Sequence, residues 1–409
     1  MDILSRIAIH SEWEKYFLYK KEQGNLARKD EDDIKSFIDN KEYLSVIKNI
    51  ISGNSFGPPK KTLINKSKVG KKRTVYTFSR EENYVLKLIT FMLRDYDDIF
   101  APNLYSFRKD RGVKRATKDI LKIKELNTRY VYKVDIHDYF NSININILLP
   151  QLRDVLKNDL KLFEFFKNLL ENPYVEFNKS LIKENKGIMA GVPISTFLAN
   201  VYLKELDYYF YKNKIPYMRY SDDIIIFTKN EEELNSSIQT IKSFLNEKEL
   251  EVNEEKEFIT LPNNEWTFLG FSYNLGVIDI SKVSFEKLKA KMKRKTRALS
   301  RWADKKGVSG EKTAVVFIKK FNAKLYDNPI DSELTWTRWF FPVINTDKTL
   351  KQIDEYMLEC IRYLATGKRT KSKYNLRYED IKALGYRSLV NEYYKQKNES
   401  IKQQKLKIY

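Results

Sequence analysis

Two neighbouring carboxylates, Asp222 and Asp223, stand directly before three isoleucines and a phenylalanine in the segment RYSDDIIIF (219–227). A β-branched apolar run of this kind predicts a buried strand, and buried strands usually exclude charge. Crowded carboxylates repel each other, and their pKa values rise unless a cation neutralises them. The doublet therefore indicates either a solvated turn that leads into a strand or a site for a hard cation.

A third carboxylate, Asp135, ends another predicted strand, YVYKVDI (130–136). If the two strands are neighbours in one sheet, Asp135 meets the doublet at one edge. Mg²⁺ prefers oxygen ligands and accepts one or two carboxylates together with substrate phosphates. Two such ions about 3.5–4 Å apart can activate a hydroxyl and stabilise a leaving pyrophosphate. The three carboxylates therefore fit nucleotidyl transfer with two Mg²⁺ ions, or with Mn²⁺ in their place, and a solvated turn stays open as the alternative.

The composition favours a polyanionic partner. The chain has 409 residues, with 75 Lys+Arg against 55 Asp+Glu and a formal charge of +20, and a soluble protein this basic usually binds nucleic acid. No apolar run approaches the roughly 18 residues that span a bilayer, and the charged start argues against a secretory signal. We expect a cytoplasmic protein without membrane contact. One cysteine and two histidines exclude the usual zinc sites.

The elements around the carboxylates follow from hydrophobic periodicity. Strands are predicted at 130–136, within 216–228 as a hairpin, and at 266–274, and helices at 164–170, 194–210 and 231–250. The segment 180–193 is predicted to be a loop. Strand, helix, hairpin, helix and strand in this order are typical of a small antiparallel sheet backed by helices, an α+β fold.

Five segments of the chain resemble, in order, the consecutive motifs of reverse transcriptases: KVDIHDYFNSI, GIMAGVPISTFLANVYLKELD, RYSDDIIIF, LEVNEEKEFI and WTFLGF. Upstream, GKKRTVYTFSREENYVLKLI and LYSFRKDRGVKRA resemble the fingers motifs of group II intron-like enzymes. The resemblance implies a right-hand polymerase, with fingers at 1–134, a palm at 135–275 and an α-helical thumb at 276–409.

Residue by residue, the resemblance assigns the metal ions to Asp135, Asp222 and Asp223, with the backbone carbonyl of Ile136 as a further ligand. Lys256 matches a lysine proposed to protonate the leaving pyrophosphate. The alternative for Lys256 is a solvated lysine at a helix end.

A second group is implied to bind the incoming deoxynucleotide: Lys66, Lys68, Arg73, Asp138, Tyr139, Phe140 and Gly191. Arg73 and the lysines before it would neutralise the triphosphate, since an arginine fork suits phosphate; alternatively, this run contacts the template backbone. Asp138 and Tyr139 would offer backbone N–H groups. The Phe140 ring would exclude a ribose 2′-hydroxyl, and its alternative is an ordinary core phenylalanine.

Tyr220 and Ser221 complete the Y-x-D-D box, but Met189-Ala190-Gly191 replaces the Pro-Gln-Gly of group II-like enzymes. This departure puts the packing of the template–nucleotide pair in doubt. Retron-specific signatures and an endonuclease segment are absent. The remaining pattern resembles the unknown-group bacterial reverse transcriptases, many of which act in phage defence, and the tail at 363–395 resembles theirs.

Two basic regions are expected to follow nucleic acid: one includes Lys60 and Lys61, and the other Lys291, Lys293, Arg294, Lys295 and Arg297. The segment 285–302 carries cations on every side, which predicts a poor core helix and a good phosphate-tracking one. A merely solvated basic face is the alternative.

The expected function is the copying of a partner non-coding RNA into DNA, in antiviral defence, with dNTPs as substrates and a DNA/RNA hybrid as product. Template-independent or protein-primed synthesis, and a non-catalytic, maturase-like RNA-binding protein, are the alternatives. The sequence leaves the oligomeric state open, a homo-oligomer included.

Overall fold

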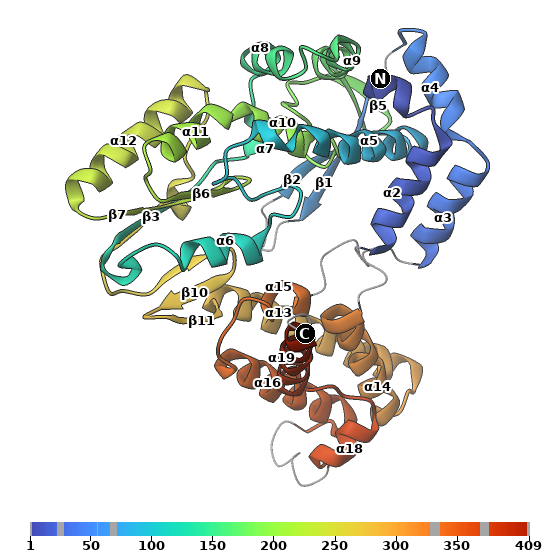
Figure 1. Cartoon of the computed structure of the whole chain (residues 1–409). Coiled ribbons are helices and arrows are strands. Elements are labelled where there is room, and N and C mark those ends of the chain that lie inside the picture. The colour runs from blue at the N-terminus through green and yellow to red at the C-terminus, as the bar shows by residue number, and fades with distance from the viewer. Residues whose placement is uncertain are drawn as a thin grey trace. The chain divides into compact units, whose positions relative to one another are not determined.

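The computed structural model describes residues 2–22, 28–54, 56–65, 72–327, 336–368 and 376–406. They form two compact units, Met1–Asn264 (unit 1) and Glu265–Tyr409 (unit 2) (Figure 1). All three carboxylates of interest belong to unit 1.

Unit 1 combines helices with two sheets. Its helices are α1 (Ile3–Arg6), α2 (His10–Glu22), α3 (Arg28–Asp39), α4 (Tyr43–Ile51), α5 (Arg80–Met92), α6 (Val113–Ile120), α7 (Tyr139–Ser142), α8 (Ile145–Val155), α9 (Leu160–Glu171), α10 (Ser195–Tyr202), α11 (Lys204–Lys212) and α12 (Glu231–Glu247). Its strands are β1 (Lys60–Asn65), β2 (Lys72–Thr77), β3 (Tyr130–Asp135), β4 (Tyr174–Phe177), β5 (Ser180–Lys183), β6 (Tyr217–Tyr220), β7 (Asp223–Thr228) and β8 (Phe258–Thr260). Short 3₁₀ helices lie at Leu93–Ile99, Leu126–Thr128 and Glu254–Lys256.

The central sheet of unit 1 has the strand order β6-β7-β3-β8, and neighbouring strands run antiparallel. β7 lies between β6 and β3, and its residues Ile224 to Phe227 are fully buried. Helix α12 packs on β3 and β7 (Figure 1). The apolar run after the acidic doublet is therefore an inner strand of a packed sheet.

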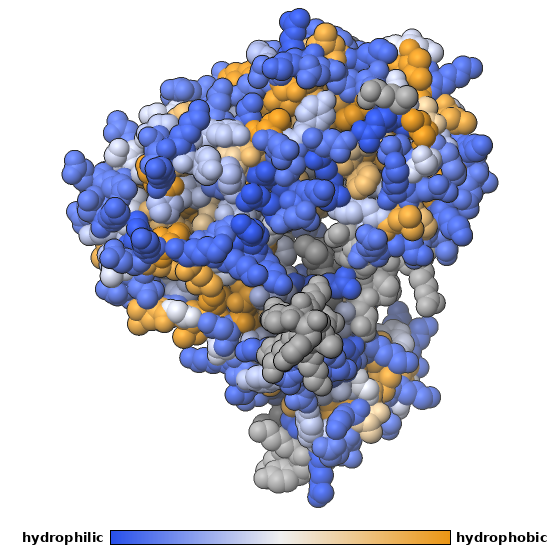
Figure 2. Space-filling model, viewed as in Figure 1, coloured by the Kyte–Doolittle hydropathy of each residue, from blue (hydrophilic) through white to orange (hydrophobic). Residues whose placement is uncertain are grey.

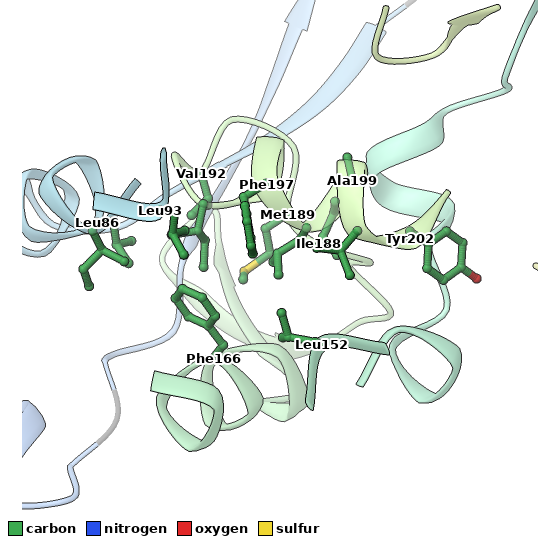
Figure 3. Close-up of a cluster of buried hydrophobic side chains, with 14 of the residues drawn as sticks. Leu86, Leu93, Leu152, Phe166, Ile188, Met189, Val192, Phe197, Ala199 and Tyr202 are labelled. Carbon is green, nitrogen blue, oxygen red and sulfur yellow. The ribbon is translucent and has the colours of Figure 1, made fainter. Parts of the chain in front are cut away.

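The second sheet has the order β2-β1-β4-β5. Beside it, the segment 187–192 passes through a hydrophobic cluster formed with α5, α8, α9 and α10, which contains Leu152, Phe166 and Phe197 (Figure 3). Ile188 and Met189 have no exposed surface. The segment is thus fixed by burial although it is neither helix nor strand.

Unit 2 begins with a sheet of order β11-β10-β9, from β9 (Trp266–Phe268), β10 (Phe271–Asn274) and β11 (Val277–Ile280). The described residues after β11 form these helices: α13 (Lys282–Lys306), α14 (Gly310–Asn322), a π-helical turn (Ala323–Asp327), α15 (Trp336–Phe340), α16 (Lys348–Thr366), α18 (Tyr378–Ala383) and α19 (Leu389–Leu406).

The expected α+β class and the hairpin of β6 and β7 are confirmed. Two expectations were wrong. Residues 180–183 form β5 rather than a loop, and α13 buries a stripe of Leu288, Met292, Thr296 and Leu299. Among the described residues, no helix has the length and apolarity to cross a bilayer. Figure 2 shows a mostly hydrophilic surface on the viewed face.

The predicted three-part division stays a prediction, and the structure groups two segments differently. β9 and β10 lie in unit 2 rather than with the central sheet. β4 and β5, which follow Asp135 in the sequence, join the sheet of β1 and β2.

Candidate active site

The end of β3 faces the start of β7, and Asp135 lies directly opposite Asp223 in the antiparallel register. The amide of Ile136 donates to the carbonyl oxygen of Asp222 at 3.2 Å. This bond makes Asp135 and Asp223 a non-hydrogen-bonded pair, whose Cα atoms approach to about 4.5 Å and whose side chains share one face. The predicted adjacency of the two strands is confirmed.

The local charge balance of this site favours a cation. Burial raises the pKa of Asp223 to about 6, Lys133 opposes the rise, and the charges of Asp222 and Asp135 add to it. The pKa of Asp222 is also raised, first by burial and then by Asp135, while Lys256 and Arg73 lower it. A raised carboxyl pKa means that the ionised form lacks compensation.

Asp135 is held from the segment after α12. The Lys256 ammonium lies 2.7 Å from Asp135 Oδ1, and Asn253 Nδ2 donates to the same oxygen at 3.3 Å. The Asn253 amide also donates to the backbone oxygen of Asp135 at 2.8 Å. Lys256 is therefore paired with the carboxylate while its side chain stays largely exposed at the end of a 3₁₀ helix, and its role in proton transfer stays a prediction.

The donor chemistry fits a hard divalent ion, because Asp135, Asp222 and Asp223 supply carboxylate oxygens and two of them have raised pKa values. Within the described ranges, however, no three Asp, Glu, His or Cys side chains are gathered closely enough to hold an ion as they stand. The metal-ligand roles, including that of the Ile136 carbonyl, stay predictions.

The predicted nucleotide-binding residues lie around α7. Asp138 precedes the helix with φ +41°, and its side chain is exposed. The Tyr139 ring is buried and its hydroxyl donates to the Ala199 carbonyl oxygen at 2.6 Å. Phe140 is half-buried and packs edge-on against Tyr139. Only the backbone of Tyr139 could therefore meet a triphosphate, whereas Phe140 keeps exposed surface.

The segment around Gly191 links this region to the second sheet. The amide of Tyr76 in β2 donates to the Ala190 carbonyl oxygen at 2.8 Å, and the Ala190 amide donates to Asn141 Oδ1 at 3.2 Å. A Cβ on Gly191, whose φ is +99°, would lie 3.1 Å from the Tyr76 carbonyl oxygen. Close backbone approach therefore requires this glycine.

Arg73 lies on β2, and its positive charge lowers the pKa of Asp222. Lys66 and Lys68 fall outside the described residues. Tyr220 is half-buried, and Ser221 is buried with φ +61° in the turn between β6 and β7.

The residues predicted to contact nucleic acid differ in solvent exposure and in their ion pairs. Lys60 is exposed. The Lys61 ammonium lies 2.5 Å from a Glu184 carboxylate oxygen, so this ion pair would have to open before Lys61 could bind a phosphate. On α13 most of the predicted cations are exposed: Lys291, Lys293, Arg294 and Arg297. Lys295 is half-buried, and its pKa is lowered by burial and by Lys320.

Two residues that lie near the carboxylates, Lys133 and Asn253, were not identified from the sequence. Lys133 lies two residues before Asp135 on β3, so its side chain is on the same face of the sheet as Asp135 and Asp223. The alternation of the strand could have shown this. Asn253 contacts Asp135 across 118 residues of sequence, for which the sequence gives no signal.

Comparison with known proteins adds independent information. A family model described as "Reverse transcriptase (RNA-dependent DNA polymerase)" matches residues 58–273, more than half of the chain. The Retron Ec83 reverse transcriptase of Escherichia coli is 25% identical over 171 residues, which are 41% of this chain and 52% of that protein. The group II intron-encoded protein LtrA of Lactococcus lactis subsp. cremoris is 26% identical over 238 residues, 57% of this chain and 38% of the relative.

The chain thus spans about half or less of these curated relatives. Among solved structures, the apo telomerase of Candida tropicalis gives a TM-score of 0.45 at 16% identity, covering 81% of this chain and 69% of that one. From the family match over residues 58–273, the chain belongs to the reverse transcriptase family.

Proposed function

We propose that this chain is an RNA-directed DNA polymerase whose active site is the edge formed by β3 and β7. The observation that carries the proposal is the opposition of Asp135 and Asp223, with Asp222 beside them, in a member of the reverse transcriptase family. In the predicted right-hand arrangement β6, β7 and β8 belong to the palm at 135–275, and β3 enters it at Asp135.

In the reaction, the 3′-hydroxyl of the primer loses its proton to solvent, its oxygen attacks the α-phosphorus of the dNTP, and the bond from that phosphorus to the pyrophosphate oxygen breaks. Asp135, Asp222 and Asp223 would hold two Mg²⁺ ions, and these ions would lower the hydroxyl pKa and neutralise the developing charge. Arg73 is proposed to bind the triphosphate and Phe140 to pack against the sugar. Lys256 is proposed to hold the proton that the leaving pyrophosphate receives.

The test is primer extension with purified protein, an RNA template, an annealed DNA primer and dNTPs, followed by sequencing of the product. We expect a templated copy from the wild type and a loss of about 100–1,000-fold in Asp223→Asn, because a charged ligand proposed to stabilise the transferring centre is lost. Asp98→Asn, at an exposed carboxylate of unit 1, should leave synthesis unchanged. A homopolymer would instead support template-independent synthesis. RNA binding without synthesis would support the maturase-like alternative.

The finer parts of the proposal are a dedicated non-coding RNA partner, antiviral defence, and membership of the group II-like or unknown-group branch. They rest on the sequence motifs and on the tail at 363–395. Sequencing RNA that co-purifies with the protein, and infecting cells that carry wild type or Asp223→Asn with phage, tests both roles. Equal protection by the two proteins would contradict a defence role that depends on synthesis.

A further inference from the structure

Directly behind the acidic doublet lies an ion pair with no exposed surface, between Arg219 of β6 and Asp207 of α11. The guanidinium donates twice, from Nε to Asp207 Oδ1 at 2.8 Å and from Nη2 to Oδ2 at 2.6 Å. Buried ion pairs are often no more stabilising than apolar side chains of similar volume. A gain in stability therefore does not by itself account for this pair.

The pair contacts the turn that carries the catalytic carboxylates. Arg219 Nη1 donates to the Ser221 carbonyl oxygen at 3.2 Å, and the Ser221 amide donates to Ser106 Oγ at 2.8 Å. Ser221 has φ +61°, a left-handed conformation that is unfavourable for a residue other than glycine. Both backbone polar groups of this strained residue are thus held by buried side chains, directly before Asp222.

The arginine is itself fixed from several elements. Tyr217 donates its hydroxyl proton to Asp207 Oδ1 at 2.9 Å, and Asn103 Nδ2 donates to the Asp207 carbonyl oxygen at 2.9 Å. Arg219 Nη2 also donates to the Asn200 carbonyl oxygen at 3.4 Å, at the end of α10. A planar fork can make these bonds together, whereas a lysine cannot.

We propose that Arg219, oriented by Asp207, is a positioning residue that fixes the left-handed turn at Ser221 and thereby aims Asp222 and Asp223. The inference rests on the proposed function, since the turn matters only if its carboxylates bind the ions of the reaction. Groups that orient ligands in this indirect way typically change metal affinity or activity by about 10–100-fold when removed.

The test removes the buried polar group while keeping its volume, in the variant Asp207→Leu/Tyr217→Phe/Arg219→Met. Circular dichroism confirms folding, Mn²⁺ binding is followed by electron paramagnetic resonance, and kcat and the dNTP KM are measured separately. We expect Mn²⁺ affinity and kcat to fall by about 10–100-fold with the dNTP KM unchanged. Leu234→Ala, a buried truncation in α12, is the control for lost stability.

Wild-type kcat and Mn²⁺ affinity in the folded variant would overturn the proposal, and so would equal losses in Leu234→Ala. If the triple variant does not fold, Arg219→Lys, which keeps the charge but not the fork, is measured in the same way and decides between the same outcomes. If the wild type makes no DNA but binds Mn²⁺ more tightly than the variants, the proposed function fails and the positioning role stands.

Discussion

Replacing Gly187 by alanine should disturb the nucleotide side of the site from within the core. Gly187 has φ +52°, and a Cβ there would lie 2.5 Å from the Phe140 carbonyl oxygen and 2.6 Å from the carbonyl carbon of Asn141. The Ile188 amide donates to the same Phe140 oxygen at 2.9 Å. Because Ile188 and Met189 are fully buried (Figure 3), the segment cannot move away freely.

The loss in the free energy of unfolding expected for Gly187→Ala has two parts, and a matched glycine separates them. Gly53 also has a left-handed φ, +77°, but a Cβ there meets nothing within 4 Å. Gly53→Ala should therefore lower the free energy of unfolding only by the left-handed strain, about 1–2 kcal/mol. Gly187→Ala adds a backbone clash, and overpacking of this kind costs about 1–3 kcal/mol more.

Hydrogen–deuterium exchange of unit 1 peptides at increasing urea measures both variants without interference from unit 2. Because the clash meets the backbone of Phe140 and Asn141, we also expect a higher dNTP KM in Gly187→Ala but not in Gly53→Ala. If the free energy of unfolding falls equally in the two variants, the segment at 187–192 does not pack tightly against the backbone of α7. That result would refute the reasoning.

Phe140→Ala should raise ribonucleotide incorporation relative to deoxynucleotide by about 10–200-fold if the ring excludes a hydroxyl; an unchanged ratio of kcat/KM values would mark Phe140 as packing only. Asp354→Ala should lower the urea stability of unit 2 by about 3 kcal/mol, because Asp354 accepts bonds from Tyr386 and Ser388 and from the first amide of α19; retained stability would contradict this. In EDTA, the Asp223 carboxyl, with a pKa of about 6 against 3.8, binds its proton more tightly when folded, so wild-type stability falls as pH rises from 4 to 6. Asp223→Asn should then be more stable by about 3 kcal/mol at pH 8 and by nothing at pH 3, as urea unfolding at the two pH values would show.

The strands that carry the carboxylates could be predicted because their signals are local. The apolar runs after Asp223 and before Asp135 each indicate a strand from a few residues. Their β-branched content leaves few alternatives to a strand. The contacts of Lys256 and Asn253 with Asp135 could not be predicted, since they depend on where the chain returns beside β3 after more than 100 residues.

β5 escaped prediction because its turn lacks the usual sequence. Asn178 and Lys179 connect β4 to β5, and both have positive φ, as a two-residue type I′ turn requires. Asn-Gly would have indicated such a hairpin, whereas Asn-Lys does not. On α13 the apolar stripe was overlooked because lysines surround it, although long lysine stems can flank a buried stripe while their charges stay in solvent.

The negative charge at the start of β7 is explained by the fixed position of this strand in the sheet. Ile224 to Phe227 are fully buried between two neighbouring strands, so the strand is fixed in place and keeps Asp222 and Asp223 only partly exposed to water at its start. The metal-free protein therefore holds two carboxyls with raised pKa values, and a bound cation would remove that penalty. Mg²⁺ at 100 times its dissociation constant should then raise the stability of unit 1 by about 2.7 kcal/mol, and Asp223→Asn should lose most of this gain. If Mg²⁺ stabilises both proteins equally, the ion binds elsewhere and the carboxylates do not form its site.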